Sequence, residues 1–206
     1  MAKLLYTYEN PSSARDLKEA CTVLRNGGTL AYPTDVNWAF GCDPLSKKAI
    51  QRILMLKPSH PSEQPFSLLC DSISMIASVA DVDQLAFRLL RKIFPGPYTV
   101  ILNRNRSFPK HMKDKRMQVG VRIPDTNLII DLIRAFGQPI ATTSVPYQLT
   151  EGKYKDRLLH FGYEIEEVYG HGLDLILDLG QAVPAKETTI LDLTKGEPEL
   201  VRQGDS

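Results

Sequence analysis

The chain has 206 residues, of which 43% are hydrophobic and 24% are charged, and its formal net charge is +1. This composition is ordinary for a globular protein and sufficient for one sizeable core, so we expect a single domain spanning residues 1–206. Three widely spaced cysteines exclude a disulfide framework and a CxxC metal site, and no apolar run approaches the roughly 18 residues of a membrane span. Residues 1–8 lack the apolar stretch of a secretion signal, so we expect a cytoplasmic location.

Helix and strand signals alternate along the chain, which is the pattern of an α/β fold. Each predicted helix follows a residue whose side-chain oxygen can accept from the first backbone N–H groups. The predicted helices follow Ser12 or Ser13, Ser46, Asp83, and Asp125 or Thr126. The predicted strands cover residues 29–32, 66–69, 98–102, 119–123, 140–143, 173–179, 189–193 and 199–202. Residues 145–155 are polar and without period, so they are predicted to form a loop.

The stretch from Tyr32 to Pro44, Tyr-Pro-Thr-Asp-Val-Asn-Trp-Ala-Phe-Gly-Cys-Asp-Pro, is predicted to form a loop after the first strand, and it carries a hydroxyl, a carboxylate, an amide and the only tryptophan. Open α/β sheets bind their ligands on loops that leave a strand, so this stretch is a candidate binding site. A rigid turn is the alternative, in which Asp35 and Asn37 bond locally and Trp38 caps the core. The residues of this stretch alone fit both interpretations.

Further segments recur in the same order in one protein family. These segments are residues 95–102, 119–124, 139–144 and 187–194, with Arg202 after them. On these motifs the chain resembles the YrdC/YciO family of threonylcarbamoyl-AMP synthases over nearly its whole length. The resemblance implies one domain with a twisted mixed sheet, helices packed on it and a central concave cavity. It also implies a nucleotidyltransferase that, with magnesium, combines ATP, bicarbonate and L-threonine into threonylcarbamoyl-adenylate and pyrophosphate, after which the carbamoyl group reaches tRNA.

The resemblance assigns residues to two parts of a site and leaves the catalytic residues unassigned. The expected substrate-binding residues are Thr34, Arg122 and Thr142, and the expected nucleotide-binding residues are Lys57, Ser144, Thr188 and Arg202. Arg122 lies inside an apolar strand pattern, where a charge needs a partner, and its planar fork suits a carboxylate. The alternative for Arg122 is a structural pair with a buried acid such as Asp35 or Asp192.

The chain departs from the family's pattern at several positions. Ser59 replaces the arginine of a Lys-x-Arg pair, Pro146 replaces the asparagine of a Ser-x-Asn sequence, and Val36 replaces a threonine. Such losses are typical of the YciO branch, so the chain is identified as a YciO-type member with reduced synthase activity. Two alternatives stay open: a nucleotide- or double-stranded-RNA-binding protein with a lapsed catalytic set, and an ATP-dependent enzyme acting on another small acid.

A basic segment is a candidate RNA or phosphate patch. Its residues are Arg104, Arg106, Lys110, Lys113, Lys115 and Arg116. A basic segment can bind tRNA or double-stranded RNA, although a run of lysines is more often a solvated surface. The four histidines share no ligand spacing with cysteines or carboxylates, so no protein-bound metal is expected.

Overall fold

The computed structural model describes residues 1–57, 66–106, 117–146, 149 and 153–205. Its strands are β1 (Lys3–Tyr6), β2 (Thr29–Pro33), β3 (Trp38–Cys42), β4 (Ser67–Leu69), β5 (Tyr98–Asn103), β6 (Gln118–Arg122), β7 (Ile140–Ser144), β8 (Leu175–Asp178), β9 (Thr189–Asp192) and β10 (Glu199–Arg202). Its helices are α1 (Ala14–Arg25), α2 (Lys47–Met55), α3 (Ile73–Ala77), α4 (Gln84–Ile93), α5 (Asn127–Phe136) and α6 (Gly162–Tyr169).

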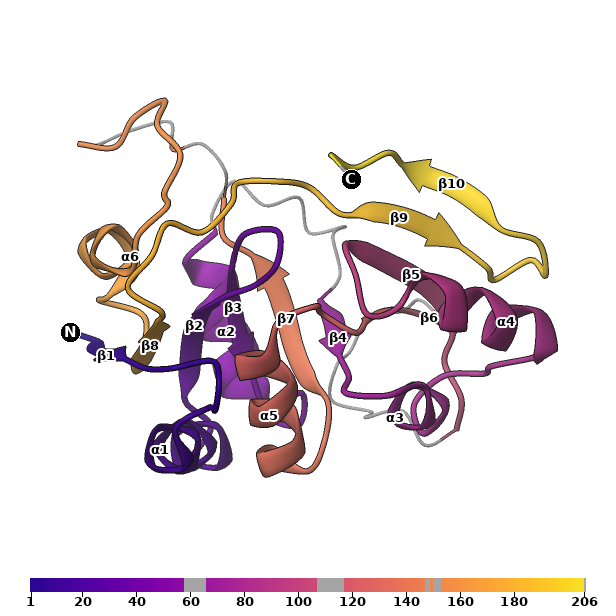
Figure 1. The fold of residues 1–206 in the computed structure, drawn as a ribbon, viewed down its shortest axis with the longest axis horizontal. Helices are drawn as coiled ribbons and strands as arrows, with labels where there is room; N and C mark the ends of the chain where they lie inside the picture. Colours follow the sequence, from indigo (N-terminus) through magenta and orange to yellow (C-terminus); the bar gives the residue numbers. More distant parts are fainter. Residues whose placement is uncertain (58–65, 107–116, 147–148, 150–152, 206) are drawn as a thin grey trace.

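The ten strands of the described residues form one mixed sheet (Figure 1). Its strand order is β1-β8-β2-β3-β7-β4-β6-β5-β9-β10, so several neighbouring strands, such as β1 and β8, come from distant parts of the chain. The sheet contains parallel pairs such as β4 and β6 and antiparallel pairs such as β2 and β3. The predicted fold class, an α/β protein with a mixed sheet, is confirmed.

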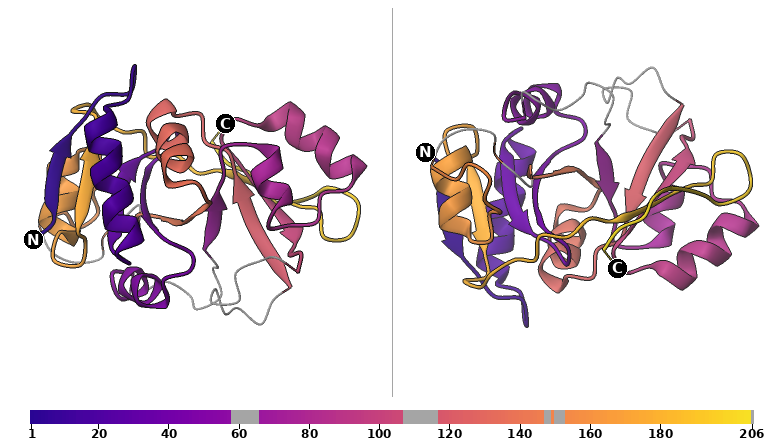
Figure 2. Two further views of the ribbon diagram at one scale, coloured as in Figure 1. Left: turned by 90° about the horizontal axis from the view of Figure 1, so that it is seen from below. Right: turned by 90° about the horizontal axis from the view of Figure 1, so that it is seen from above.

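Helices cover both faces of the sheet. On one face α1 and α5 pack side by side, and Leu24 and Leu132 meet the strand residue Leu30. The other face packs against α2, α3, α4 and α6 in a second core cluster, which contains Ala31. Neighbours Leu30 and Ala31 belong to different clusters because successive side chains of a strand point to opposite faces. The β9–β10 hairpin lies on the other side of the molecule from β1 (Figure 2).

Side-chain caps begin three helices where the sequence predicts them. The Ser13 hydroxyl, the Ser46 hydroxyl and the Asp83 carboxylate each accept a hydrogen bond from a backbone N–H of the first turn. Gly137 ends α5 with a φ of 83°, the left-handed conformation that favours glycine. Within the described residues no helix is both long enough and apolar enough to cross a membrane.

The predicted loop after the first strand is wrong in its second half. Residues 34–37 form a turn, but Trp38–Cys42 is β3, a buried strand antiparallel to β2. Periodicity cannot assign an apolar run this short to a strand. The turn residues directly before it favour a loop instead. The elements β1, α3 and α6 are also missing from the prediction, and most of the predicted loop at 145–155 lies outside the described residues.

Candidate functional site

A cavity of about 480 Å³ lies on the face of the sheet that carries α1 and α5. Ala39 and Leu69 fix its position, because both line the cavity and also belong to the core cluster that packs against these helices. The turn between β2 and β3 contributes to the lining. The strands β3, β7, β4, β6, β5, β9 and β10, which are neighbours in this order in the sheet, also contribute. The cavity therefore joins parts of the chain that are far apart in the sequence.

Alternate residues of four strands point into the cavity, as the period of a strand requires. These residues are Ser67 and Leu69 of β4, Thr99 and Ile101 of β5, Gln118, Gly120 and Arg122 of β6, and Thr142 and Ser144 of β7. The register places Thr142, Ser67, Gly120 and Ile101 in one row across β7, β4, β6 and β5. The cavity floor is thus built from hydroxyl groups and short apolar side chains.

Gly120 keeps space open in the middle of this row. A Cβ atom on Gly120 would lie 2.7 Å from Ser67 Oγ and 3.3 Å from Thr99 Cγ2. Any larger side chain at this position would enter the cavity, because Gly120 itself lines it. The Val-Gly-Val-Arg motif therefore places its glycine in the floor and its arginine, Arg122, at the wall.

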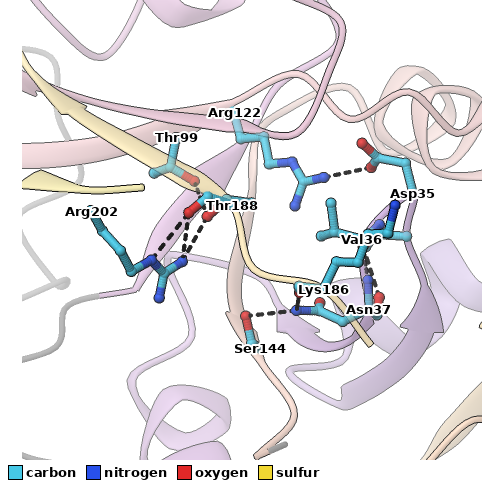
Figure 3. Close-up of polar contacts among 10 residues, drawn as sticks. Asp35, Val36, Asn37, Thr99, Arg122, Ser144, Lys186, Thr188 and Arg202 are labelled. Atoms are coloured by element: carbon cyan, nitrogen blue, oxygen red, sulfur yellow. Dashed lines mark hydrogen bonds and ion pairs between the residues drawn. The ribbon is translucent and has the colours of Figure 1, made fainter. Parts of the chain in front are cut away.

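Arg122 is 6% exposed and pairs with a carboxylate of the β2–β3 turn. Its Nη2 lies 2.5 Å from Asp35 Oδ1, so of the two acids considered as partners the structure selects Asp35 rather than Asp192 (Figure 3). Arg122 Nε is buried and has no hydrogen-bond partner among the described residues. Arg122 is therefore the cation of a structural ion pair and also a cavity-lining group with an unused donor.

The hydroxyls of Thr34 and Thr142 both line the cavity, and both are already hydrogen-bonded within the protein. Thr34 Oγ1 donates to the Asn37 carbonyl at 2.7 Å and closes the turn. Thr142 Oγ1 donates to the Phe40 carbonyl at 3.1 Å and accepts from the Tyr32 hydroxyl at 3.0 Å. Each hydroxyl has one proton, so a ligand would have to displace these bonds to receive it.

Arg202 and Thr188 form the wall next to β10. The Arg202 guanidinium donates to the Thr188 carbonyl from Nε at 3.1 Å and from Nη2 at 2.9 Å, and Nη2 also contacts Thr188 Oγ1 at 3.0 Å (Figure 3). Its Nη1 lies 3.3 Å from Glu187, a pair in which both side chains are about two-fifths exposed. The predicted nucleotide-binding residues Thr188 and Arg202 are thus in direct contact.

Lys57 contacts the opposite wall. Its ammonium lies 2.9 Å from Thr143 Oγ1 and 2.7 Å from the Ser144 carbonyl, and both of these residues line the cavity. Burial lowers the pKa of Lys57 to about 8. None of the described residues that line the cavity is acidic, so its charged groups, Arg122 and Arg202 with Lys57 beside them, favour an anionic ligand.

The low pKa of Lys57 predicts a stability that depends on pH. Between pH 8 and about 10 the unfolded chain keeps this proton while the folded chain has lost it, so stability should rise with pH across this window. We expect the free energy of unfolding of the wild type to rise relative to Lys57→Met from pH 8 to pH 10. Urea unfolding of both proteins at several pH values measures the difference, and parallel pH profiles would contradict the prediction.

Comparison with known proteins identifies the family to which this fold and cavity belong. The family model Sua5_yciO_yrdC, described as "Telomere recombination", matches residues 22–204. The chain belongs to the Sua5/YciO/YrdC family. This family member is 32% identical to the uncharacterized protein YciO of Escherichia coli over 205 residues, 99% of this chain and 96% of the relative. It is 30% identical to the threonylcarbamoyl-AMP synthase of Cellvibrio japonicus over 179 residues, 86% of this chain and 91% of the relative.

Solved structures of the family share the fold. The crystal structure of E. coli YciO matches with a TM-score of 0.87 and 30% identity, covering all of this chain and 97% of the other. The structure of Pyrococcus abyssi Sua5 complexed with L-threonine matches with a TM-score of 0.84 and 23% identity, covering 98% of this chain and 58% of the other. At that identity the second match shows a common fold.

The remaining predicted site residues of this Sua5/YciO/YrdC protein fall into two groups. Lys110, Lys113, Lys115 and Arg116 of the basic segment lie outside the described residues, as does Ser59. Arg104 and Arg106 are described, and neither lines the cavity. In the described ranges no three histidine, cysteine, aspartate or glutamate side chains are grouped to hold a metal ion.

Two residues of the β2–β3 turn have surroundings that the sequence does not indicate. Val36 does not line the main cavity but a second one of about 300 Å³, so the loss of a hydroxyl there removes no group from the main cavity. Asn37 lines the main cavity, and its amide bonds to Ser144 and Lys186 rather than within the turn. Only the sheet order brings these partners together, and no local signal indicates it.

Proposed function

We propose that this family member is an L-threonylcarbamoyladenylate synthase-like nucleotidyltransferase with reduced activity. It uses ATP with magnesium, bicarbonate and L-threonine in the pathway to tRNA threonylcarbamoyladenosine. The observation that carries this proposal is the cavity, which is lined by hydroxyls and two arginines and by no acidic group among its described residues. The relative that shares this fold and is complexed with L-threonine supports an amino-acid substrate.

The proposed reaction has two bond-forming steps. The amino nitrogen of L-threonine attacks the carbon of bicarbonate, and loss of water leaves a carbamate. A carbamate oxygen then attacks the α-phosphorus of ATP, and the bond to the β-phosphate oxygen breaks to release pyrophosphate. The first step joins a neutral amine to an anion, and the second joins two anions. The protein's contribution is therefore to hold the reactants together and to offset their negative charge.

The described residues fit this division of labour. Arg122, through its unused Nε donor, is proposed to receive the threonine carboxylate, with Thr34 and Thr142 forming the adjacent wall. The proposed nucleotide-binding residues are Lys57, Ser144, Thr188 and Arg202. Magnesium would enter with ATP rather than bind to protein carboxylates, because the described lining contains none.

Incubation of the pure protein with ATP, magnesium, bicarbonate and labelled L-threonine tests the proposal. We expect threonylcarbamoyl-adenylate and pyrophosphate to form together, and neither to form when bicarbonate is omitted. Absence of the adenylate at high enzyme concentration would overturn the proposal. RNA binding that weakens steeply with salt, without adenylate formation, would favour the alternative function.

Lys57→Ala is expected to weaken ATP binding about tenfold or more, because a charge-assisted contact to phosphate is worth about 1.5–3 kcal/mol. The fold should survive, since the Lys57 ammonium contacts only Thr143 and Ser144 among its described partners. Titration calorimetry with ATP and magnesium measures the affinity, and affinity should also fall as pH rises above about 8, where Lys57 loses its charge. Unchanged ATP affinity in Lys57→Ala would remove Lys57 from the site.

A further inference from the structure

Asn37 is held at the cavity wall by its backbone and by its side chain. The Asn37 carbonyl accepts from the Thr34 N–H at 2.9 Å and from the Thr34 hydroxyl at 2.7 Å, and its N–H donates to that hydroxyl at 3.2 Å. Asn37 is 7% exposed and lines the cavity. The turn therefore fixes the backbone of Asn37, and the side-chain amide is held at the wall by its bond to the Lys186 carbonyl.

The Asn37 amide connects the turn with two other walls. Its Nδ2 donates to the Lys186 carbonyl at 3.1 Å, an ordinary hydrogen-bond length, and lies 3.5 Å from Ser144 Oγ, at the outer limit (Figure 3). Asp35, two residues earlier, is directed at Arg122 instead. The single turn thus orients one group at the proposed carboxylate-binding end and another at Ser144.

Two donors converge at Ser144. The Asn37 amide approaches its hydroxyl, and the Lys57 ammonium contacts its carbonyl at 2.7 Å from the neighbouring side. Pro146, two residues further on, has no side-chain donor. A ligand oxygen placed here would exchange the long amide–hydroxyl contact for two hydrogen bonds to an anion, which are the stronger kind.

We propose that Asn37 is a ligand-contacting residue, whose amide N–H and the Ser144 hydroxyl together bind an anionic phosphate oxygen of the nucleotide. The inference rests on the proposed function and adds a specificity-determining residue to the same site. The inference also assigns the two ends of the cavity to different ligands. Asn37 contacts the phosphate of the nucleotide, and Arg122 binds the amino acid.

Calorimetric binding of ATP with magnesium, and separately of L-threonine, to Asn37→Ala and Asn37→Asp tests this role. We expect ATP affinity to fall about tenfold in Asn37→Ala and further in Asn37→Asp, whose charge repels phosphate, while L-threonine affinity is retained. Asn103→Ala is the matched control, because it removes an amide bond to the Thr194 carbonyl of the same 3.1 Å length outside the cavity. It should bind ATP like the wild type, and because Asn103 is exposed it should melt no lower than Asn37→Ala.

Two results would overturn the inference. Unchanged ATP affinity in Asn37→Ala would remove the amide from the ligand site, and an equal loss of ATP and L-threonine binding with a lower melting temperature would make Asn37 a structural link only. If the wild type binds ATP more tightly than Asn37→Ala does but forms no adenylate, the proposed reaction is refuted and this inference is retained. Wild-type protein that binds no ATP would overturn both.

Discussion

Replacing Asp35 with alanine is expected to lower the free energy of unfolding by about 3–5 kcal/mol. The side chains of Asp35 and Arg122 are 14% and 8% exposed, so the substitution leaves a guanidinium buried without its counter-charge. Desolvation of an unpaired charge is the dominant cost, since the lost contact itself is a single ion pair. Urea unfolding of wild type and Asp35→Ala at pH 7 measures the difference.

The exposed pair Lys195–Glu199 supplies the control. Its side chains are 79% and 65% exposed, so Glu199→Ala should cost less than about 1 kcal/mol. If Arg122 binds a ligand carboxylate, L-threonine should raise the melting temperature of Asp35→Ala more than that of the wild type, because it restores a partner. A stability loss no larger than that of Glu199→Ala would mean that the buried pair is worth little.

Arg122→Lys separates the two roles of Arg122 in the same experiment. A lysine keeps a positive charge opposite Asp35, so stability should stay near that of the wild type, but it has no planar fork to hold a second carboxylate. L-threonine affinity should therefore fall about tenfold or more. A large drop in melting temperature with affinity retained would contradict the substrate role.

Gly120→Leu is expected to abolish ligand binding, with an affinity loss of about a hundredfold or more, while the sheet remains folded. Gly120 lies between Ser67 and Thr99 in the cavity floor, so a leucine would occupy the space in which the reactants meet. A hundredfold loss of affinity corresponds to about 2.7 kcal/mol of binding free energy. The loss of a few contacts between ligand and protein exceeds this value. Titration calorimetry with ATP and with L-threonine measures both affinities.

The Cβ atom of the new side chain is the atom most expected to destabilise the fold, because it would lie 2.7 Å from Ser67 Oγ. The double variant Ser67→Ala/Gly120→Leu relieves this contact and should melt above Gly120→Leu while still failing to bind. Gly120→Ala should lie between wild type and Gly120→Leu in affinity. Wild-type affinity in a folded Gly120→Leu would show that ligands do not use this cavity.

Local signals predict the longer helices that follow a capping residue, but they miss α6 and also the five-residue helix α3, although the Ser72 hydroxyl caps it. Ser13, Ser46 and Asp83 each accept a first-turn N–H, and each is visible in the sequence. The helix α6 begins differently: the Glu164 carboxylate, inside the helix, accepts from the N–H groups of His160 and Phe161. With no serine, threonine, aspartate or asparagine before it, α6 shows no start signal.

The cavity could be predicted only in part for a related reason. Arg122 can be predicted as a site residue because it is a charge within an apolar strand pattern, and Thr34 can be predicted because it lies in a motif. Ser67 carries no such mark, and the motifs that contain Thr99 and Gly120 do not show that these two residues line a cavity, since a small or hydroxyl residue in a strand is common. Their meeting depends on the strand order and register, which arise from packing across the whole sheet rather than from neighbouring residues.

The order in which the chain is synthesised has a consequence for the site. The cavity is lined from Thr34 in the first turn after β2 to Arg202 at the end of β10, and the hairpin of β9 and β10 forms its last wall. A nascent chain can therefore pair β2 with β3 early, yet its binding site lacks this wall until β9 and β10 have left the ribosome. Ligand can stabilise the site only after that point, so ligand binding reports that β9 and β10 have been synthesised and have folded.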